Sequence, residues 1–215
     1  MPSIIETTVY QISELEEPAK EEARSWYRQH GLYDDWFEFV YEDFLAIAKI
    51  LGLDIKERCH TNRFGHSYCE PQIYFRGFWC QGDGASFCAF YSYQKGSTKA
   101  IREYAPKDEV LHDIADELYD LQKRNFFQLH VDITQDSSMY CHENTMQFFL
   151  ERYSPSYQLC TENAEKEVAC IFRRLAKWLY RALEAEYEYQ TSDKIIDECL
   201  AANEYTFTAE GRRFG

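Results

Sequence analysis

The sequence lacks several features that would have placed it in a class at once. It contains no long apolar run, so no membrane-spanning segment is expected. Its start, Met1 to Glu6, has no basic stretch followed by an apolar one, so no signal peptide is expected and a cytoplasmic location is predicted. No internal repeat or linker is visible. The length fits a single domain over 1–215 with a flexible tail at about 210–215.

No recognised catalytic signature is present either. The stretch Gly82-Asp83-Gly84 is not a Walker loop, because no Gly-Lys-Ser/Thr opens a helix there, and it is not a dinucleotide fingerprint. Cys80 is a conceivable nucleophile, with packing inside a hairpin as the ordinary alternative. Other acid–base groups share no familiar spacing: His66, Asp83, His130 and Glu143. An uncharacterised hydrolase is therefore the weakest functional hypothesis, and no cofactor is expected.

Eight cysteines are present, and in a reducing cytoplasm they are expected to be free thiols. The stretch 59–69 brings together two cysteines and two histidines, which suggests zinc: Cys59, His60, His66 and Cys69. The spacing matches no known zinc knuckle, and adjacent Cys59 and His60 rarely reach one tetrahedral ion together. A polar loop without metal is the prediction.

Aromatic residues are abundant, at 17% of the chain, and they are dense between 72 and 93. This stretch reads as two apolar strands around Gln81-Gly82-Asp83-Gly84, with Asp83-Gly84 predicted as a type I′ hairpin turn. That turn places Gly82 opposite Ala85 and Arg76 opposite Tyr91. Both faces of the hairpin are then apolar, so either helices cover both faces or one face is a docking surface.

Apolar periodicity predicts helices and strands in an order typical of an α+β fold. The expected architecture is a mostly antiparallel sheet centred on the 72–93 hairpin and covered by four to six helices. Helices are predicted over about 18–30, 35–51, 96–104, 108–124, 161–187 and 192–200. Further strands are predicted over about 3–12, 53–59, 126–134, 146–153 and 204–208.

The net charge is −14, but residues 56–102 hold seven Lys and Arg against three Asp and Glu, a local net charge of +4. An acidic protein is not expected to bind nucleic acid directly. Backbone N–H groups near glycines can hold an anion, so a small-anion or nucleotide-binding protein is the alternative function; an ordinary tight turn is the simpler reading. The candidate ligand- or partner-binding residues are Arg76, Gln81, Gly82, Asp83, Gly84 and Ser86.

Six segments together resemble a family of phage, prophage and mobile-element proteins labelled "antitoxin of toxin–antitoxin stability system". They are AKEEARSWYR (19–28), YEDF (41–44), IYFRGFWCQGDGASF (73–87), AIREYAP (100–106), EYEYQTSD (186–193) and ANEYTFT (202–208). The resemblance implies a non-enzymatic accessory protein that binds and neutralises a protein partner, either a toxin or a host-defence component. Exposed aromatic surface also favours a homodimer. Members of that family carry Ser in place of Cys80 and generally lack Cys59 and Cys69.

Overall fold

The computed structural model describes residues 6–32, 35–63, 65–136 and 140–215. The fold is α+β with antiparallel strand pairing throughout, as the sequence predicts. Contacts divide the chain into two compact units, Met1–Glu38 with Glu184–Gly215, and Phe39–Leu183. The boundary falls inside one helix, α5 (Ala164–Gln190). That the two units unfold together, as a single domain does, stays a prediction.

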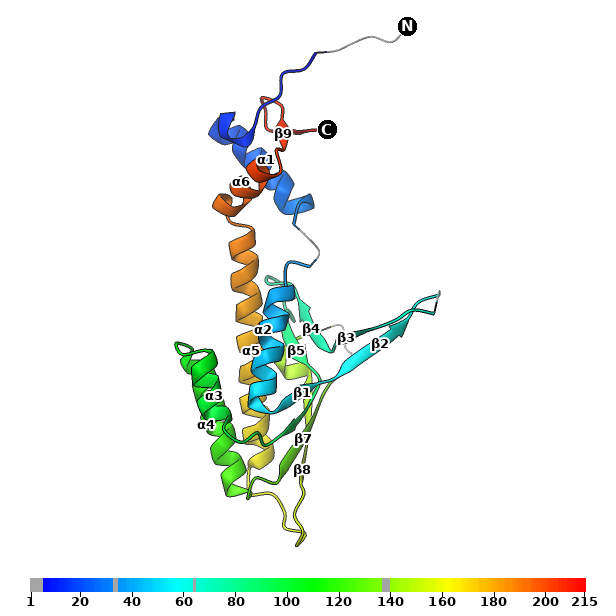
Figure 1. The fold of residues 1–215 in the computed structure, drawn as a ribbon, viewed down its shortest axis with the longest axis vertical. Helices are drawn as coiled ribbons and strands as arrows, with labels where there is room; N and C mark the ends of the chain where they lie inside the picture. The colour runs from blue at the N-terminus through cyan, green and yellow to red at the C-terminus, as the bar shows by residue number, and fades with distance from the viewer. Residues whose placement is uncertain (1–5, 33–34, 64, 137–139) are drawn as a thin grey trace. The chain divides into compact units, whose positions relative to one another are not determined.

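The larger unit, Phe39–Leu183, is built on a four-stranded sheet (Figure 1). The strand order is β1-β6-β7-β8, with β6 and β7 in the middle. These strands are β1 (Leu53–Ile55), β6 (Ala89–Ser92), β7 (Leu129–Gln135) and β8 (Met146–Arg152). Two separate pairs accompany the sheet: β2 (Glu57–Thr61) with β3 (Ser67–Pro71), and β4 (Ile73–Arg76) with β5 (Gly84–Phe87).

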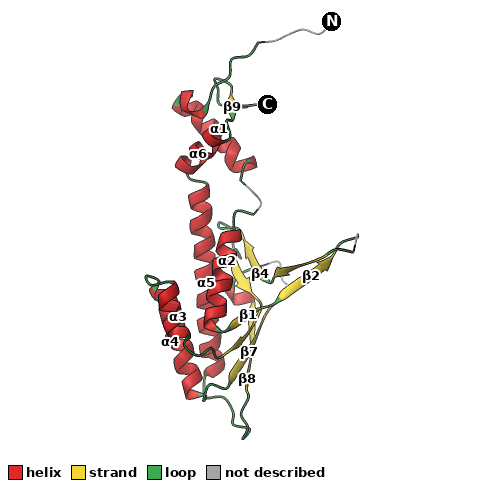
Figure 2. Ribbon diagram, viewed as in Figure 1, coloured by secondary structure: helices red, strands yellow, loops and turns green. Residues whose placement is uncertain are grey.

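Helices pack on one face of this sheet (Figure 2). The ring of Tyr91 in β6 lies 5.1 Å from that of Phe172 in α5, measured between centroids. Burial alternates along β6 and β7, as expected for a sheet with one covered and one solvated face. One face of this four-stranded sheet is therefore open, and its use as a docking surface stays a prediction. The helices of this unit besides α5 are α2 (Glu38–Leu51), α3 (Ser97–Tyr104) and α4 (Glu109–Arg124).

The smaller unit packs two helices against the chain ends. Its elements are η1 (Ile12–Glu14), α1 (Glu17–His30), α6 (Asp193–Ala202), β9 (Thr206–Phe207) and β10 (Arg213–Phe214). Arg24, 7% exposed, forms a bidentate ion pair with Asp197 at 2.7 and 2.8 Å. Within the expected flexible tail at 210–215, Arg213 and Phe214 form strand β10, paired with β9, and the flexibility of the tail stays a prediction.

The strand expected over 3–12 lies partly outside the described residues, which begin at 6. Within the described part, Tyr10 makes a single bridge to Phe207. In the described part of the chain, no helix is both long enough and apolar enough to cross a bilayer.

The predicted register of the 72–93 hairpin is wrong. Arg76 lies opposite Gly84, not Tyr91, and Tyr74 lies opposite Ser86. Residues 77–83 form a loop, and the chain changes sheets at Cys88, whose N–H donates to Gln72 while its carbonyl accepts from Lys56 N. The hairpin is thus divided: β4 and β5 pair with each other, and β6 is an inner strand of the main sheet.

The glycines explain why the turn is not centred on Asp83-Gly84. Positive φ occurs at Gly77 (45°) and Gly82 (92°), and not at Gly84. A glycine is required at position 84 for a steric reason instead, because a Cβ there would lie 2.5 Å from Cβ of His142. A type I′ turn requires positive φ at both central residues, so this backbone excludes the expected turn.

The prediction of eight free thiols is also wrong, because Cys59 and Cys69 form a disulfide. The two residues are directly opposite in the β2–β3 ribbon, with Cα atoms 4.0 Å apart. The predicted polar loop is in fact this ribbon, and strand pairing brings the sulfurs together. With both sulfurs bonded to each other, neither is a thiolate ligand for zinc in this state. The other six cysteines are free.

Candidate functional site

The glycine loop 77–83 is organised around its own carboxylate. Oδ2 of Asp83 accepts hydrogen bonds from Trp79 N at 2.9 Å and from Cys80 N at 2.6 Å. These are the kind of backbone N–H groups that an external anion would use. A phosphate bound there would have to displace Asp83, so the loop geometry works against the small-anion hypothesis. Trp79 itself is 78% exposed at the tip of the loop.

The six residues predicted as a binding site do not form one surface. Arg76 and Gln81 are exposed, whereas Ser86 is fully buried and donates its hydroxyl to Oε1 of Gln135 at 2.6 Å. Gly82 and Gly84 make room for the side chains of Tyr140 and His142. The glycines and Ser86 therefore have packing roles.

The open face of the four-stranded sheet is the more distinctive surface, and sequence analysis did not find it. Strand register aligns one row across all four strands, from β1 to β8: Asp54, Phe90, Asp132 and Phe149. Acidic and aromatic residues alternate along this row. Phe90 is 53% exposed and Phe149 is 56% exposed. We call this surface, together with Ser92, His130, Glu151 and Tyr153 beside it, the outer face.

A lysine of the chain already occupies part of the outer face. Lys56 Nζ lies 4.2 Å from the centroid of the Phe90 ring and forms an ion pair with Asp132. A cation above an aromatic face and next to a carboxylate is a favourable arrangement. Beside it, the rings of His130 and Tyr153 stack with centroids 4.2 Å apart.

The outer face is hollowed and carries a net negative charge. A depression of about 610 Å³ is lined by residues of all four strands, including Asp54, Phe90, Phe149, Glu151 and Tyr153. Among the described residues of this face, three carboxylates (Asp54, Asp132 and Glu151) outnumber the one ammonium group, that of Lys56. Exposed rings next to unneutralised carboxylates form a surface suited to lysine or arginine side chains. In the sequence, the outer face is marked by a polar or aromatic residue at every second position of these strands.

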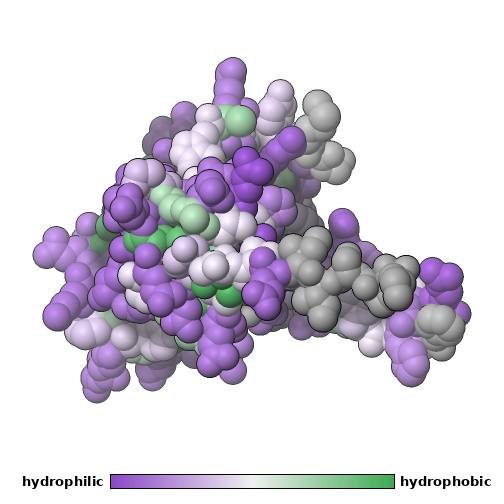
Figure 3. Space-filling model, turned by 90° about the horizontal axis from the view of Figure 1, so that it is seen from above, coloured by the Kyte–Doolittle hydropathy of each residue, from purple (hydrophilic) through white to green (hydrophobic). Residues whose placement is uncertain are grey.

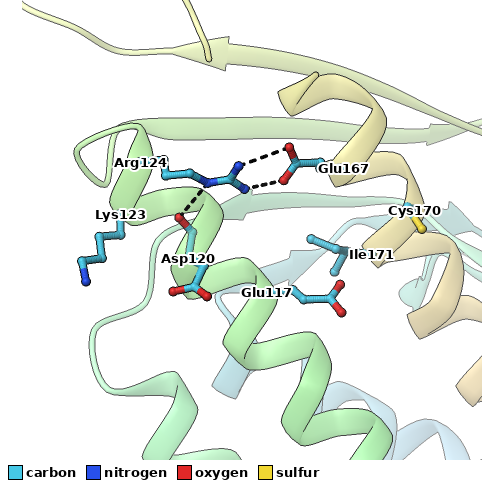
Figure 4. A pocket seen from close by; sticks show the side chains of 7 residues that line it. All are labelled: Glu117, Asp120, Lys123, Arg124, Glu167, Cys170 and Ile171. Carbon is cyan, nitrogen blue, oxygen red and sulfur yellow. Dashed lines mark hydrogen bonds and ion pairs between the residues drawn. The ribbon is translucent and has the colours of Figure 1, made fainter. Parts of the chain in front are cut away.

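A larger depression, of about 770 Å³, lies between α4 and α5 (Figure 4). Arg124 pairs there with Glu167 and donates to the backbone carbonyl of Asp120. Glu117 at its edge pairs with Arg174 at 2.6 Å. These ion pairs join the two helices to each other, so the charged groups are accounted for by helix packing.

Three of the four acid–base groups noted in the sequence are engaged in separate interactions. Asp83 accepts from backbone N–H groups, His130 stacks on Tyr153, and Glu143 pairs with Lys177 at 3.2 Å. Among the described residues, no hydrogen bond joins Asp83, His130 and Glu143 to one another.

Comparison with known proteins places the chain in one family. The model of the family described as "Domain of unknown function (DUF8835)" matches residues 36–193. The chain belongs to the DUF8835 family. The DUF8835 match includes the whole of the larger unit, and therefore the outer face and the glycine loop, whereas α1, β9 and β10 lie beyond it. No curated protein and no solved structure matches the chain.

Proposed function

We propose that this protein is a non-enzymatic binding protein that engages and neutralises a basic protein partner through the outer face. The observation that carries the proposal is the exposed row Asp54–Phe90–Asp132–Phe149, which alternates carboxylates and rings across four strands. Large apolar side chains gathered on one exposed face commonly mark a binding surface. Aromatic anchors near the centre of an interface commonly supply most of its binding energy.

Charge supports a basic partner in particular. The whole protein has a net charge of −14, and the surface seen in Figure 3 is predominantly hydrophilic. A negative field of this kind speeds the encounter with a positively charged protein. At the outer face, a partner's arginine or lysine would find the rings of Phe149 and Tyr153 next to the carboxylate of Glu151. Lys56 already makes such contacts from within the chain.

The biological setting of the proposal comes from the resemblance to phage and mobile-element proteins labelled as antitoxins. On that basis the partner is a toxin or a host-defence component in the cytoplasm of the host cell. Toxins and defence nucleases that handle nucleic acid have basic surfaces, since they bind phosphates. An acidic protein that covers such a surface would block it by charge and by bulk.

The test uses a photo-crosslinking amino acid at position 149, at the β8 end of the row, and at position 99 as the control. Lys99 is a suitable control because its side chain is 83% exposed and lies in α3, away from the sheet. Proteins other than this chain that are crosslinked only from position 149 are identified, purified and titrated against the protein. We expect the double variant Phe90→Ser/Phe149→Ser to weaken this binding about 100-fold or more, since interface aromatics each contribute about 2 kcal/mol or more. Lys99→Ser should bind normally.

Two outcomes would overturn the proposal. One is crosslinking of the same proteins from both positions, or of none. The other is a partner that binds the double variant as tightly as the natural sequence. Asp54→Asn and Glu151→Gln give a finer test, because their effect on binding should fade as salt screens the carboxylates.

A further inference from the structure

The edge of the sheet at β8 presents backbone groups with no partner among the described residues. Tyr153 N donates to Gln128 O at 2.9 Å and Asp136 N donates to Thr145 O at 3.1 Å, which extends the β7–β8 ladder at its two ends. Bonded pairs alternate along an antiparallel ladder. The bonds to β7 are therefore made at Gln147, Phe149 and Glu151.

It follows that the N–H and C=O groups of Phe148 and Leu150 point away from β7. No hydrogen bond joins these groups to any described part of the chain. An array of this kind is a template for another strand.

The two edges of the sheet differ in how they are protected. β1, at the opposite edge, has only three residues, and a very short edge strand is one way in which proteins prevent unwanted pairing. β8 has seven residues, and its sequence MQFFLER contains no proline and no lysine. Its pairing with β7 runs without a bulge from Met146 to Arg152. Charge in this strand is confined to Glu151 and Arg152 at its C-terminal end, so β8 is the edge better suited to pairing with another strand.

We propose that a second copy of this chain pairs with β8, strand against antiparallel strand, about a twofold axis at Phe149. Residue 149 is the midpoint of the strand, so this register uses its full length. Phe149 then meets Phe149 of the second copy, and Phe148 lies opposite Leu150 of the second copy. The free N–H and C=O groups of Phe148 and Leu150 become bonded in both copies.

The strand is complementary to itself in this register. Gln147 faces Glu151 of the second copy, and Met146 faces its Arg152, so no like charges are opposed. The exposed ring of Phe149 gains an aromatic partner across the axis. The two four-stranded sheets join into one, and their outer faces form a continuous surface on one side. This inference stands independently of the basic partner proposed above.

The salt dependence of binding distinguishes the homodimer from the basic partner experimentally. Two copies with a net charge of −14 each repel one another, so added salt should strengthen the dimer. Binding of a basic partner to the acidic outer face should weaken with salt. Failure of one proposal therefore leaves the other intact.

The decisive pair of variants is Leu150→Pro and Leu150→Ala. Proline removes the outward N–H without removing a bond to β7, and an edge strand tolerates proline at such a position. Alanine shortens the side chain and keeps the N–H. In sedimentation velocity experiments, we expect the natural sequence and Leu150→Ala to dimerise and Leu150→Pro to dimerise at least ten times more weakly. The natural dimer should tighten as sodium chloride rises to about 0.5 M, where the Debye length is ~4 Å.

Two measurements keep the test valid if Leu150→Pro fails to fold. Amide exchange at Phe148 and Leu150 should slow as protein concentration rises through the micromolar range. Phe149→Cys should crosslink to itself under mild oxidation, whereas Glu151→Cys, which faces residue 147, should not; peptide mass spectrometry separates this bond from those of the six free cysteines. Three results would overturn the inference. The natural protein could stay monomeric, or amide exchange at Phe148 and Leu150 could be independent of protein concentration. The third is a dimer that still forms in Leu150→Pro and does not crosslink at position 149.

Discussion

Lys56 and Phe90 form a cation–π pair, with the ammonium nitrogen 4.2 Å from the ring centroid. The same ammonium pairs with Asp132, and its side chain is only 19% exposed. We expect Lys56→Met to lower the free energy of unfolding by about 1 kcal/mol, since a partly shielded cation–π contact and ion pair are both lost. Urea denaturation measures this change. Lys99→Met, at an exposed pair with Glu103, is the control and should change stability by less than about 0.5 kcal/mol. Equal effects of the two variants would contradict the prediction.

The Asp83 carboxylate is predicted to hold the glycine loop closed. Removing it in Asp83→Ala leaves the N–H groups of Trp79 and Cys80 without their acceptor, a local cost of about 1–2 kcal/mol. Amide exchange at these two residues should then accelerate about 5- to 30-fold. Asp83→Asn keeps one acceptor oxygen and should give a smaller acceleration. Unchanged exchange in Asp83→Ala would show that other contacts hold the loop.

Gly84 is predicted to be intolerant of any side chain for steric reasons alone. A Cβ would lie 2.5 Å from His142 Cβ and 2.8 Å from its Cα, so the backbone itself must move. We expect Gly84→Ala to destabilise by about 1–3 kcal/mol in thermal or urea unfolding. The matched control is Gly96→Ala, which meets no atom within 4 Å and costs about 1 kcal/mol for its positive φ. A Gly84→Ala protein as stable as the natural one would refute the packing account.

Thiol labelling should divide five of the eight cysteines into three groups. In protein purified without reductant, Cys59 and Cys69 should resist alkylation until the disulfide is reduced. Exposed Cys80 and Cys170 should react quickly at pH 8. Buried Cys88 should react slowly, because burial raises the pKa of its thiol and leaves less thiolate at that pH. Raising the pH should therefore accelerate the alkylation of Cys88. Labelling of Cys88 as fast as Cys80 would contradict its placement.

The two compact units provide a test of the single-domain prediction. Leu200 in α6 and Leu179 in α5 are both fully buried, one in each unit. Each change to alanine should cost about 2–5 kcal/mol. If the chain unfolds as one domain, either variant accelerates amide exchange in the cores of both units. If the units are separate, Leu200→Ala acts on α1 and α6 and leaves β6 and β7 unchanged.

Local signals in the sequence were sufficient for the helices. The stripe Leu111, Ile114, Leu118 and Leu121 predicts the helix that the structure places at Glu109–Arg124. Gly31 after His30 likewise marks the end of α1. These features depend on residues three or four apart, so no distant part of the chain is needed to interpret them. The α+β class follows from the same order of elements.

Tertiary structure alone decided the strand partners and everything built on them. Asp83-Gly84 carried a strong local turn signal, but Gly84 lies opposite Arg76 and packs against His142, which is 58 residues further along the chain. The outer-face row exists because strands distant in sequence became neighbours, whereas the disulfide lies in the local β2–β3 hairpin, where a polar loop was predicted. The alternation of apolar and polar residues shows that a strand has two different faces, but it does not show which other strands lie beside that strand. Pairing between distant strands is set by the whole fold, and with it the surface on which the proposed function depends.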